Sequence, residues 1–144
     1  MTEEQARLLQ IGDKLKVVCK DDDINKAVIV TEIRNSSFDY NFVELSEFTE
    51  YNQKDYLFQI PLTDEILGKN GFSINVFENC IYYDFPKNAG FDELIKANYH
   101  LIKYNSDDYY FFEDCPFIKV KTVDEFQRLL RLMGFVDFTN NIKV

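Results

Sequence analysis

Short runs of alternating apolar and polar residues, each bounded by a polar turn, account for much of this chain. The first run is 15–19, where Leu15, Val17 and Cys19 alternate with other side chains. A period of two places one set of side chains on one face of a strand. Similar runs predict further strands over 27–34, 38–42, 56–60, 72–77, 81–85, 99–104, 109–112 and 117–120. Because short polar turns join most of these strands, we expect mainly antiparallel pairing.

The first four strands form a group of their own. They are opened by the stretch "IGDKLKVV" and are joined by polar turns, one of which contains Asp21, Asp22 and Asp23. Four short strands of this kind are typical of a small, strongly bent antiparallel sheet. We therefore expect an SH3-like, barrel-like half over residues 10–60.

A short helix is predicted in the middle of the chain, within "IPLTDEILGKNGF". Pro61 lacks a backbone donor and ends the preceding strand, and Thr63 can cap a helix because its hydroxyl can accept a free N–H of the first turn. At the other end Gly71 can adopt a left-handed conformation and Phe72 can fold back on the helix, as in a Schellman stop. Two turns of helix need packing to be stable, so this helix should join two sheet regions.

The C-terminal helix carries the clearest pattern. Thr122 and Glu125 have the spacing of a capping box, and Gly134 with Phe135 repeats the Gly-Phe stop. Apolar residues recur at helical spacing and predict a buried stripe, whereas three polar residues should face away. The stripe contains Val123, Phe126, Leu129, Leu130 and Met133, and the polar residues are Gln127, Arg128 and Arg131. The helix should pack on the sheet, which makes the expected fold α+β.

Length and charge limit the possible classes. A chain of 144 residues with 46% hydrophobic and 16% aromatic residues can bury a core, and we expect one domain over 1–144, with its second half over 61–144. A formal charge of -9 disfavours direct nucleic-acid binding, which needs clustered basic residues. Neither a secretory signal nor a long apolar run is present, so no membrane is expected. Three distant cysteines fit a reducing cytoplasm better than a disulfide framework.

Few residues suggest chemistry. His100, the only histidine, could form a dyad with Cys115, but Glu113 and Asp114 would oppose the thiolate that such a nucleophile needs. The three aspartates at 21–23 could attract a divalent cation, but they lack the ligand spacing and the glycine of a calcium loop. An ordinary strand histidine, a structural cysteine and a solvated turn are the simpler interpretations. No phosphate-binding glycine loop or hydrolase motif is present, and no cofactor is indicated.

The segment "NSDDYYFFEDC", residues 105–115, combines four acids with four consecutive aromatic residues. Tyrosines could anchor a basic protein partner while carboxylates steer it. The alternative is a plain hairpin, with Tyr109 and Phe111 on one face and Tyr110 and Phe112 on the other. The candidate protein-binding residues are Asp107, Asp108, Tyr109, Tyr110, Phe112, Glu113 and Asp114.

The order of these motifs resembles a family of small uncharacterised proteins from phages, prophages and mobile elements of Bacteroides-type bacteria. The match rests on Pro61, Leu62, Thr63, Glu65 and the Gly-Phe stop at 71–72. The C-terminal helix departs from the family's His-Gln-Leu-Gln-Asn pattern and its Thr-Gly end. The resemblance implies no activity and no catalytic residues; it implies an accessory protein of a mobile element.

Three functional hypotheses follow. The first is a noncatalytic protein–protein interaction module, which fits the acidity and the aromatic content. The second is an acidic mimic of nucleic acid, or an inhibitor of a host defence protein, which needs the acids to form a stripe on one face. The third is an enzyme that uses His100 and Cys115. Fold class alone does not decide among them.

Overall fold

The computed structural model describes residues 8, 10, 12–19, 24–35, 41–45, 57–86 and 100–144. The chain divides into two compact units, Met1–Ile60 and Pro61–Val144. Both units contain antiparallel sheets and the second also contains helices, so the α+β prediction is confirmed. That the two units form one domain stays a prediction, and each is described by itself.

The first unit contains a four-stranded antiparallel sheet in the order β3-β2-β1-β4. The predicted alternation is visible in its core: Leu15 and Val17 are buried, and Leu15 lies opposite the buried Val28. The SH3-like character of this sheet stays a prediction, and the Asp21 to Asp23 run lies outside the described residues. The strands are β1 (Lys14–Cys19), β2 (Ile24–Asn35), β3 (Asn41–Leu45) and β4 (Leu57–Gln59).

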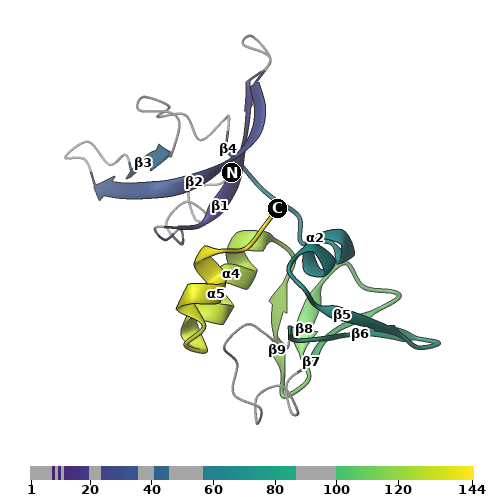
Figure 1. Cartoon of the computed structure of the whole chain (residues 1–144). Helices are drawn as coiled ribbons and strands as arrows, with labels where there is room; N and C mark the ends of the chain where they lie inside the picture. The colour runs from purple at the N-terminus through teal and green to yellow at the C-terminus, as the bar shows by residue number, and fades with distance from the viewer. Residues whose placement is uncertain are drawn as a thin grey trace. The chain divides into compact units, whose positions relative to one another are not determined.

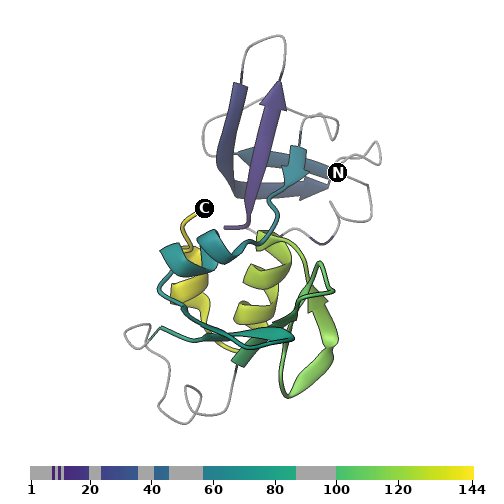
Figure 2. The same ribbon diagram turned by 90° about the vertical axis from the view of Figure 1, so that its right-hand side faces the viewer.

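The second unit contains a five-stranded antiparallel sheet whose spatial order, β5-β6-β7-β8-β9, follows the chain. The helices of the described part of this unit lie on one face of the sheet, as the two views in Figures 1 and 2 show. We call the opposite face the outer face. The strands are β5 (Ser73–Val76), β6 (Cys80–Asp84), β7 (His100–Tyr104), β8 (Tyr110–Phe112) and β9 (Cys115–Val120). The helices are α2 (Asp64–Lys69), α4 (Val123–Leu132) and α5 (Val136–Asn140).

Helix α2 begins and ends as the sequence predicts. The Thr63 hydroxyl oxygen accepts a hydrogen bond from the Ile66 N–H at 3.2 Å. At the C-terminal end, the Phe72 N–H donates to the Leu67 carbonyl oxygen and the Gly71 N–H donates to that of Gly68. These two bonds and the positive φ of Gly71 define a Schellman motif. Local sequence therefore fixes both ends of this helix.

Helix α4 also confirms its predicted caps, but one of its faces differs from the prediction. The Glu125 carboxylate accepts the Thr122 N–H at 3.3 Å, as a capping box requires, and Gly134 ends the helix at positive φ. Gln127 was expected to face away, and this expectation is wrong. Its side chain is fully buried and its amide donates to the Thr139 carbonyl oxygen of α5 at 3.1 Å. The sequence pattern did not predict α5, so a partner for Gln127 could not be foreseen.

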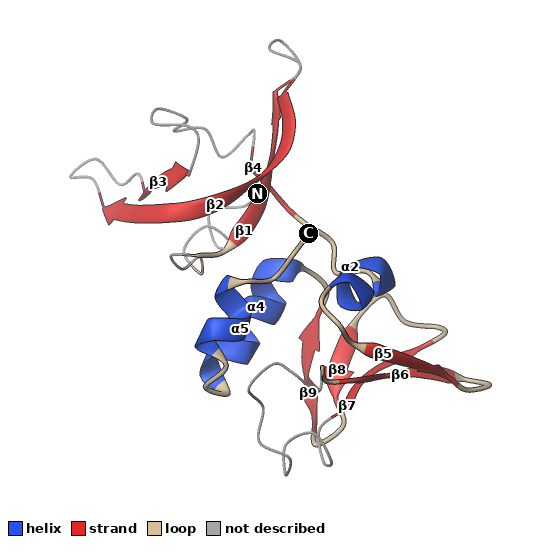
Figure 3. Cartoon of the chain, in the orientation of Figure 1, coloured by secondary structure: helices blue, strands red, loops and turns tan. Residues whose placement is uncertain are grey.

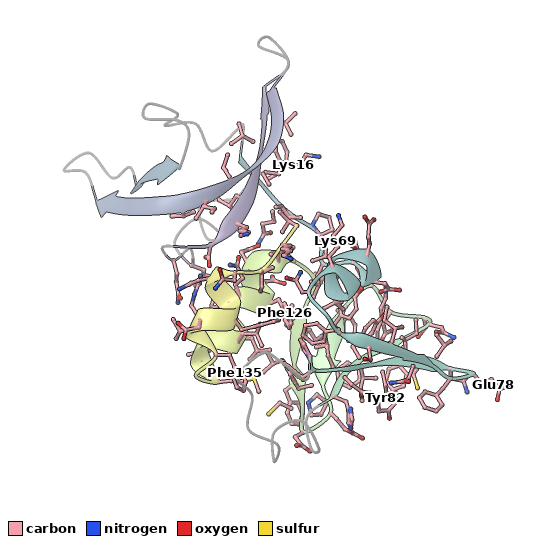
Figure 4. All side chains as sticks on the ribbon, in the orientation of Figure 1. Lys16, Lys69, Glu78, Tyr82, Phe126 and Phe135 are labelled. Carbon is pink, nitrogen blue, oxygen red and sulfur yellow. The ribbon has the colours of Figure 1, made fainter. Side chains whose placement is uncertain are left out.

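Aromatic rings fill the space between the helices and the sheet. The Phe72 ring lies 5.0 Å from that of Phe85 and 5.9 Å from that of Phe126, between ring centroids. The Phe85 ring stacks on Phe112 of β8 at 5.7 Å. Phe126 is 2% exposed, and Figure 4 places it between α4 and the sheet. Phe72, which directly follows the stop of α2, is therefore part of the core of this unit.

A partly buried carboxylate links α2 to the same sheet. Asp64, the first residue of α2, accepts hydrogen bonds on one carboxylate oxygen from the Tyr83 and Tyr110 hydroxyls, each at 2.7 Å. Burial alone would raise the pKa of Asp64. The two hydroxyl donors and the positive charge of Lys103 outweigh burial and hold this pKa below its ordinary value. The carboxylate is thus held in its charged form at the N-terminal end of the helix.

The two Gly-Phe stops provide a matched test of backbone and contact effects. Gly71 and Gly134 both have positive φ, but a Cβ on Gly71 would lie 3.2 Å from the Pro86 side chain, whereas one on Gly134 would meet nothing within 4 Å. Gly134→Ala is expected to lower the free energy of unfolding by about 1–2 kcal/mol through backbone strain alone. Gly71→Ala should lower it further because Pro86 must move. Urea unfolding followed by circular dichroism measures the difference, and equal losses would contradict this assignment.

Candidate protein-binding surface

The outer face of the second sheet is built from three rows of side chains that run across the strands. Residues paired across antiparallel strands lie on the same face, so the registers define the rows. The first row joins Phe77 to Cys80 through a backbone hydrogen bond and Cys80 to Tyr104 through strand pairing. The other two rows follow from the registers between β5 and β9. The second row is Asn75, Tyr82, Ile102, Phe111 and Lys119, and the third is Ser73, Asp84 and His100.

Aromatic rings occupy much of this face. The Tyr82 ring makes edge contacts with Phe77 at 5.3 Å and with His100 at 5.7 Å between ring centroids. Phe77 is 56% exposed and Tyr104 is 46% exposed, whereas Ile102 and Phe111 at the centre of the face are buried. Figure 4 shows Tyr82 on the opposite side of the sheet from Phe126. Aromatic side chains that remain exposed on an ordered sheet are typical of interaction surfaces.

The tip of the β5–β6 hairpin is fixed by the strand beside it. The Asn105 N–H donates to the Asn79 carbonyl oxygen at 3.1 Å, and its side-chain amide donates to the Glu78 carbonyl oxygen at 3.0 Å. Glu78 lies at the far end of this hairpin in Figure 4. The exposed Phe77 beside the turn is therefore held in a defined position, which reduces the entropy that a partner must remove on binding.

A polar trio occupies the opposite end of the outer face. His100 Nδ1 lies 2.8 Å from one oxygen of Asp84, and the Asn75 amide donates to the other oxygen at 2.8 Å. Because a carboxylate only accepts, Nδ1 carries the proton in this contact. This arrangement orients the imidazole firmly.

The hypothetical dyad gains no support from this geometry. Cys115 is exposed at the start of β9, two strands away from His100 in the sheet order. Within the described part of the chain, no hydrogen bond or ring contact joins Cys115 to His100. Nor do the described residues contain a group of three or more histidine, cysteine, aspartate or glutamate side chains that could hold a metal ion.

The candidate residues at 107–114 do not form one group in the structure. Asp107 and Asp108 precede β8 and Glu113 and Asp114 follow it, so the two acid pairs lie at opposite ends of this strand. Tyr110 and Phe112 are buried in the helix-side core, where Tyr110 donates to Asp64. They cannot anchor a partner on this folded surface, and this part of the prediction needs correction. All three residues of β8 are buried: Tyr110 and Phe112 face the helices, and Phe111 on the outer face lies against the rings of Tyr104 and Tyr109. Sequence alternation gave no sign of burial on both faces.

The remaining candidates lie near the ends of the outer face. Asp108 forms an ion pair with Lys121 at 2.7 Å, and the Tyr109 ring lies under the Lys119 ammonium at 4.1 Å. Burial raises the pKa of the Tyr82 hydroxyl, and the charge of Glu113 adds to this shift. Glu113 therefore acts electrostatically on the same face. The five remaining candidates thus place acids at both ends of an aromatic surface and not in one continuous stripe.

Sequence reasoning missed the residues that dominate this surface. Phe77, Tyr82 and Tyr104 each lie in predicted strands, but their common face depends on the registers of β5 with β6 and of β6 with β7, and a long connection separates β6 from β7. The sequence signal was the alternation within each strand. It shows which residues share a face of that strand but not which strands lie beside it.

Comparison of the chain with models of known protein families, with curated proteins and with solved structures gives no match. Among the described residues, no helix is both long and apolar enough to cross a membrane. The functional inference therefore rests on the surface itself.

Proposed function

We propose that this protein is a noncatalytic interaction module that binds a basic protein partner through the outer face of its second unit. The observation that carries the proposal is the exposed first row, Phe77 and Tyr104, on a face that also holds Tyr82. Aromatic side chains bury a large area with little loss of conformational freedom, which suits them to anchor a partner.

Charge around this row favours a basic partner. Glu78 lies at the hairpin tip and Asp107 and Asp108 follow β7, near this row, whereas Glu113 and Asp114 follow β8 at the opposite end of the face. The whole chain carries a formal charge of -9. Such a field speeds the approach of a cationic partner, and binding should weaken as salt is added.

The expected result is that Phe77→Ala and Tyr104→Ala each reduce capture of the partner at least about tenfold, because truncation of an interface anchor costs about 2 kcal/mol. Capture from lysate by immobilised protein, followed by titration with the purified partner at two salt concentrations, measures this effect. Leu132→Ala is the matched control, because Leu132 is also exposed but lies on α4. Equal capture by all variants would exclude the outer face.

The origin suggested by the central motif is part of the same proposal. We infer an accessory role in a phage or mobile element, with the partner supplied by the host cell, on the strength of Pro61, Leu62, Thr63, Glu65 and the Gly-Phe stop. Acidic mimicry of nucleic acid is less favoured, because the acids around β8 lie at its two ends.

A further inference from the structure

Strand β5 has an open edge that could pair with β5 of a second copy of the chain. In the described sheet, β5 pairs with β6 on one side and no described strand pairs with its other side. All of its residues are exposed, with Ile74 at 42% and Val76 at 73%. Figure 3 shows the β5–β6 hairpin extending beyond the helices. An exposed edge without protection is a template for pairing with another strand.

The two edges of this sheet differ in their protection. Strand β9 carries Pro116, which cannot donate a backbone hydrogen bond. It also carries Lys119, whose charge opposes edge-to-edge pairing with β9 of a second copy. Strand β5, with the sequence SINV, contains neither proline nor charge. Two copies of an acidic chain can therefore approach along β5 without placing like charges in contact.

The hydrogen-bond phase of β5 fixes which residues face the open side. The Phe77 N–H donates to the Cys80 carbonyl oxygen at 2.8 Å, so these residues form a hydrogen-bonded pair. Hydrogen-bonded and non-hydrogen-bonded pairs alternate along antiparallel strands. Asn75, two residues before Phe77, therefore directs its backbone groups to β6, while Ile74 and Val76 direct theirs outward.

We propose that two copies of this chain associate by antiparallel pairing of their β5 strands, about a two-fold axis through Asn75. In this register Ile74 of each copy lies opposite Val76 of the other, on the helix-side face. The two pairs supply about four backbone hydrogen bonds. Each exposed aliphatic side chain is covered by one from the second copy, and such a self-complementary contact is closed by its symmetry.

The association should be weak. A single pair of short strands covers less than the area of about 1,600 Å² in a standard interface. We expect a dissociation constant between about 10 µM and about 1 mM. Sedimentation velocity of the purified chain over this range should show a concentration-dependent dimer, and a monomer at every concentration would overturn the proposal.

Two matched variants test the surface. Val76→Lys places a charge in the contact and is expected to raise the dissociation constant about tenfold or more. Ile118→Lys makes the same kind of change at another exposed apolar site, on the other edge strand, and should leave association unchanged. A dimer that loses affinity with Ile118→Lys, or that tolerates Val76→Lys, would place the contact elsewhere.

A cross-link tests the register. Residue 75 would face its own copy as a non-hydrogen-bonded pair with Cα atoms about 4.5 Å apart, within the range of a disulfide. In a chain whose three cysteines are replaced by serine, Asn75→Cys should form a covalent dimer on mild oxidation, whereas Ser73→Cys should not, because residue 73 lies opposite 77. Equal cross-linking at both positions would reject this register. These measurements use the chain alone, so their outcome is independent of partner capture.

Discussion

Replacement of Phe126 by alanine is expected to lower the free energy of unfolding of the second unit by about 3–5 kcal/mol. The ring is 2% exposed and lies on the apolar stripe of α4, where it contacts Phe72. Its removal eliminates buried apolar area and leaves a cavity that tightly packed neighbours fill only in part. Since the chain has no tryptophan, urea unfolding should be followed by circular dichroism.

Phe117→Ala is the matched control for this change. It removes the same atoms from a phenylalanine on β9 that is 94% exposed. Its effect on unfolding should remain within about 0.5 kcal/mol, as for most surface substitutions. Similar losses for the two variants would mean that Phe126 is not part of the core that the helices and sheet enclose.

Replacement of Asp64 by alanine is the second large effect, with an expected loss of about 2–4 kcal/mol. The change removes the acceptor that is shared by the hydroxyls of two buried tyrosines. It also removes a negative charge from the first turn of α2. Tyr83→Phe and Tyr110→Phe should each cost less, because Asp64 then keeps one donor, and their effects in the Asp64→Ala background should be much smaller.

The contribution of Asp64 should also depend on pH. Its pKa is lowered in the folded chain, so the folded state stabilises the charged form. This stabilisation is fully present above the unfolded pKa of about 3.9 and is lost as pH falls through the lower folded value. The difference in unfolding free energy between wild type and Asp64→Ala should therefore narrow in acid. A difference that is constant from neutral pH to below about pH 3 would assign the effect to packing.

Sequence patterns predicted the helix ends and the strands well, because these features depend on interactions between residues that are close in the sequence. Thr63, Gly71 and Gly134 act through hydrogen bonds and backbone conformations within a few residues, and each holds its predicted place. Strand alternation likewise follows from backbone geometry. These signals were sufficient for an α+β fold with antiparallel sheets.

The contacts around the candidate surface could not be predicted from local patterns, because they join residues that are distant in sequence. Tyr110 appeared suited to a surface beside acids, yet it lies in an inner strand and meets Asp64, forty-six positions earlier. The contact of His100 with Asp84 depends on the register of β6 and β7. The sequence pattern placed Gln127 on the solvent-facing side of α4, but in the structure its amide donates to α5. Composition thus indicated an acidic aromatic surface, but only strand pairing selects the side chains that form it.

The order of the second sheet has a kinetic consequence. Every strand pairs with its neighbours in the chain, so no contact within the sheet requires a strand to be inserted between two others already formed. Most of these contacts close short loops, and the connection between β6 and β7 is the longest. Closure of that connection should limit the rate at which the sheet assembles, and the hairpins on either side can form before it.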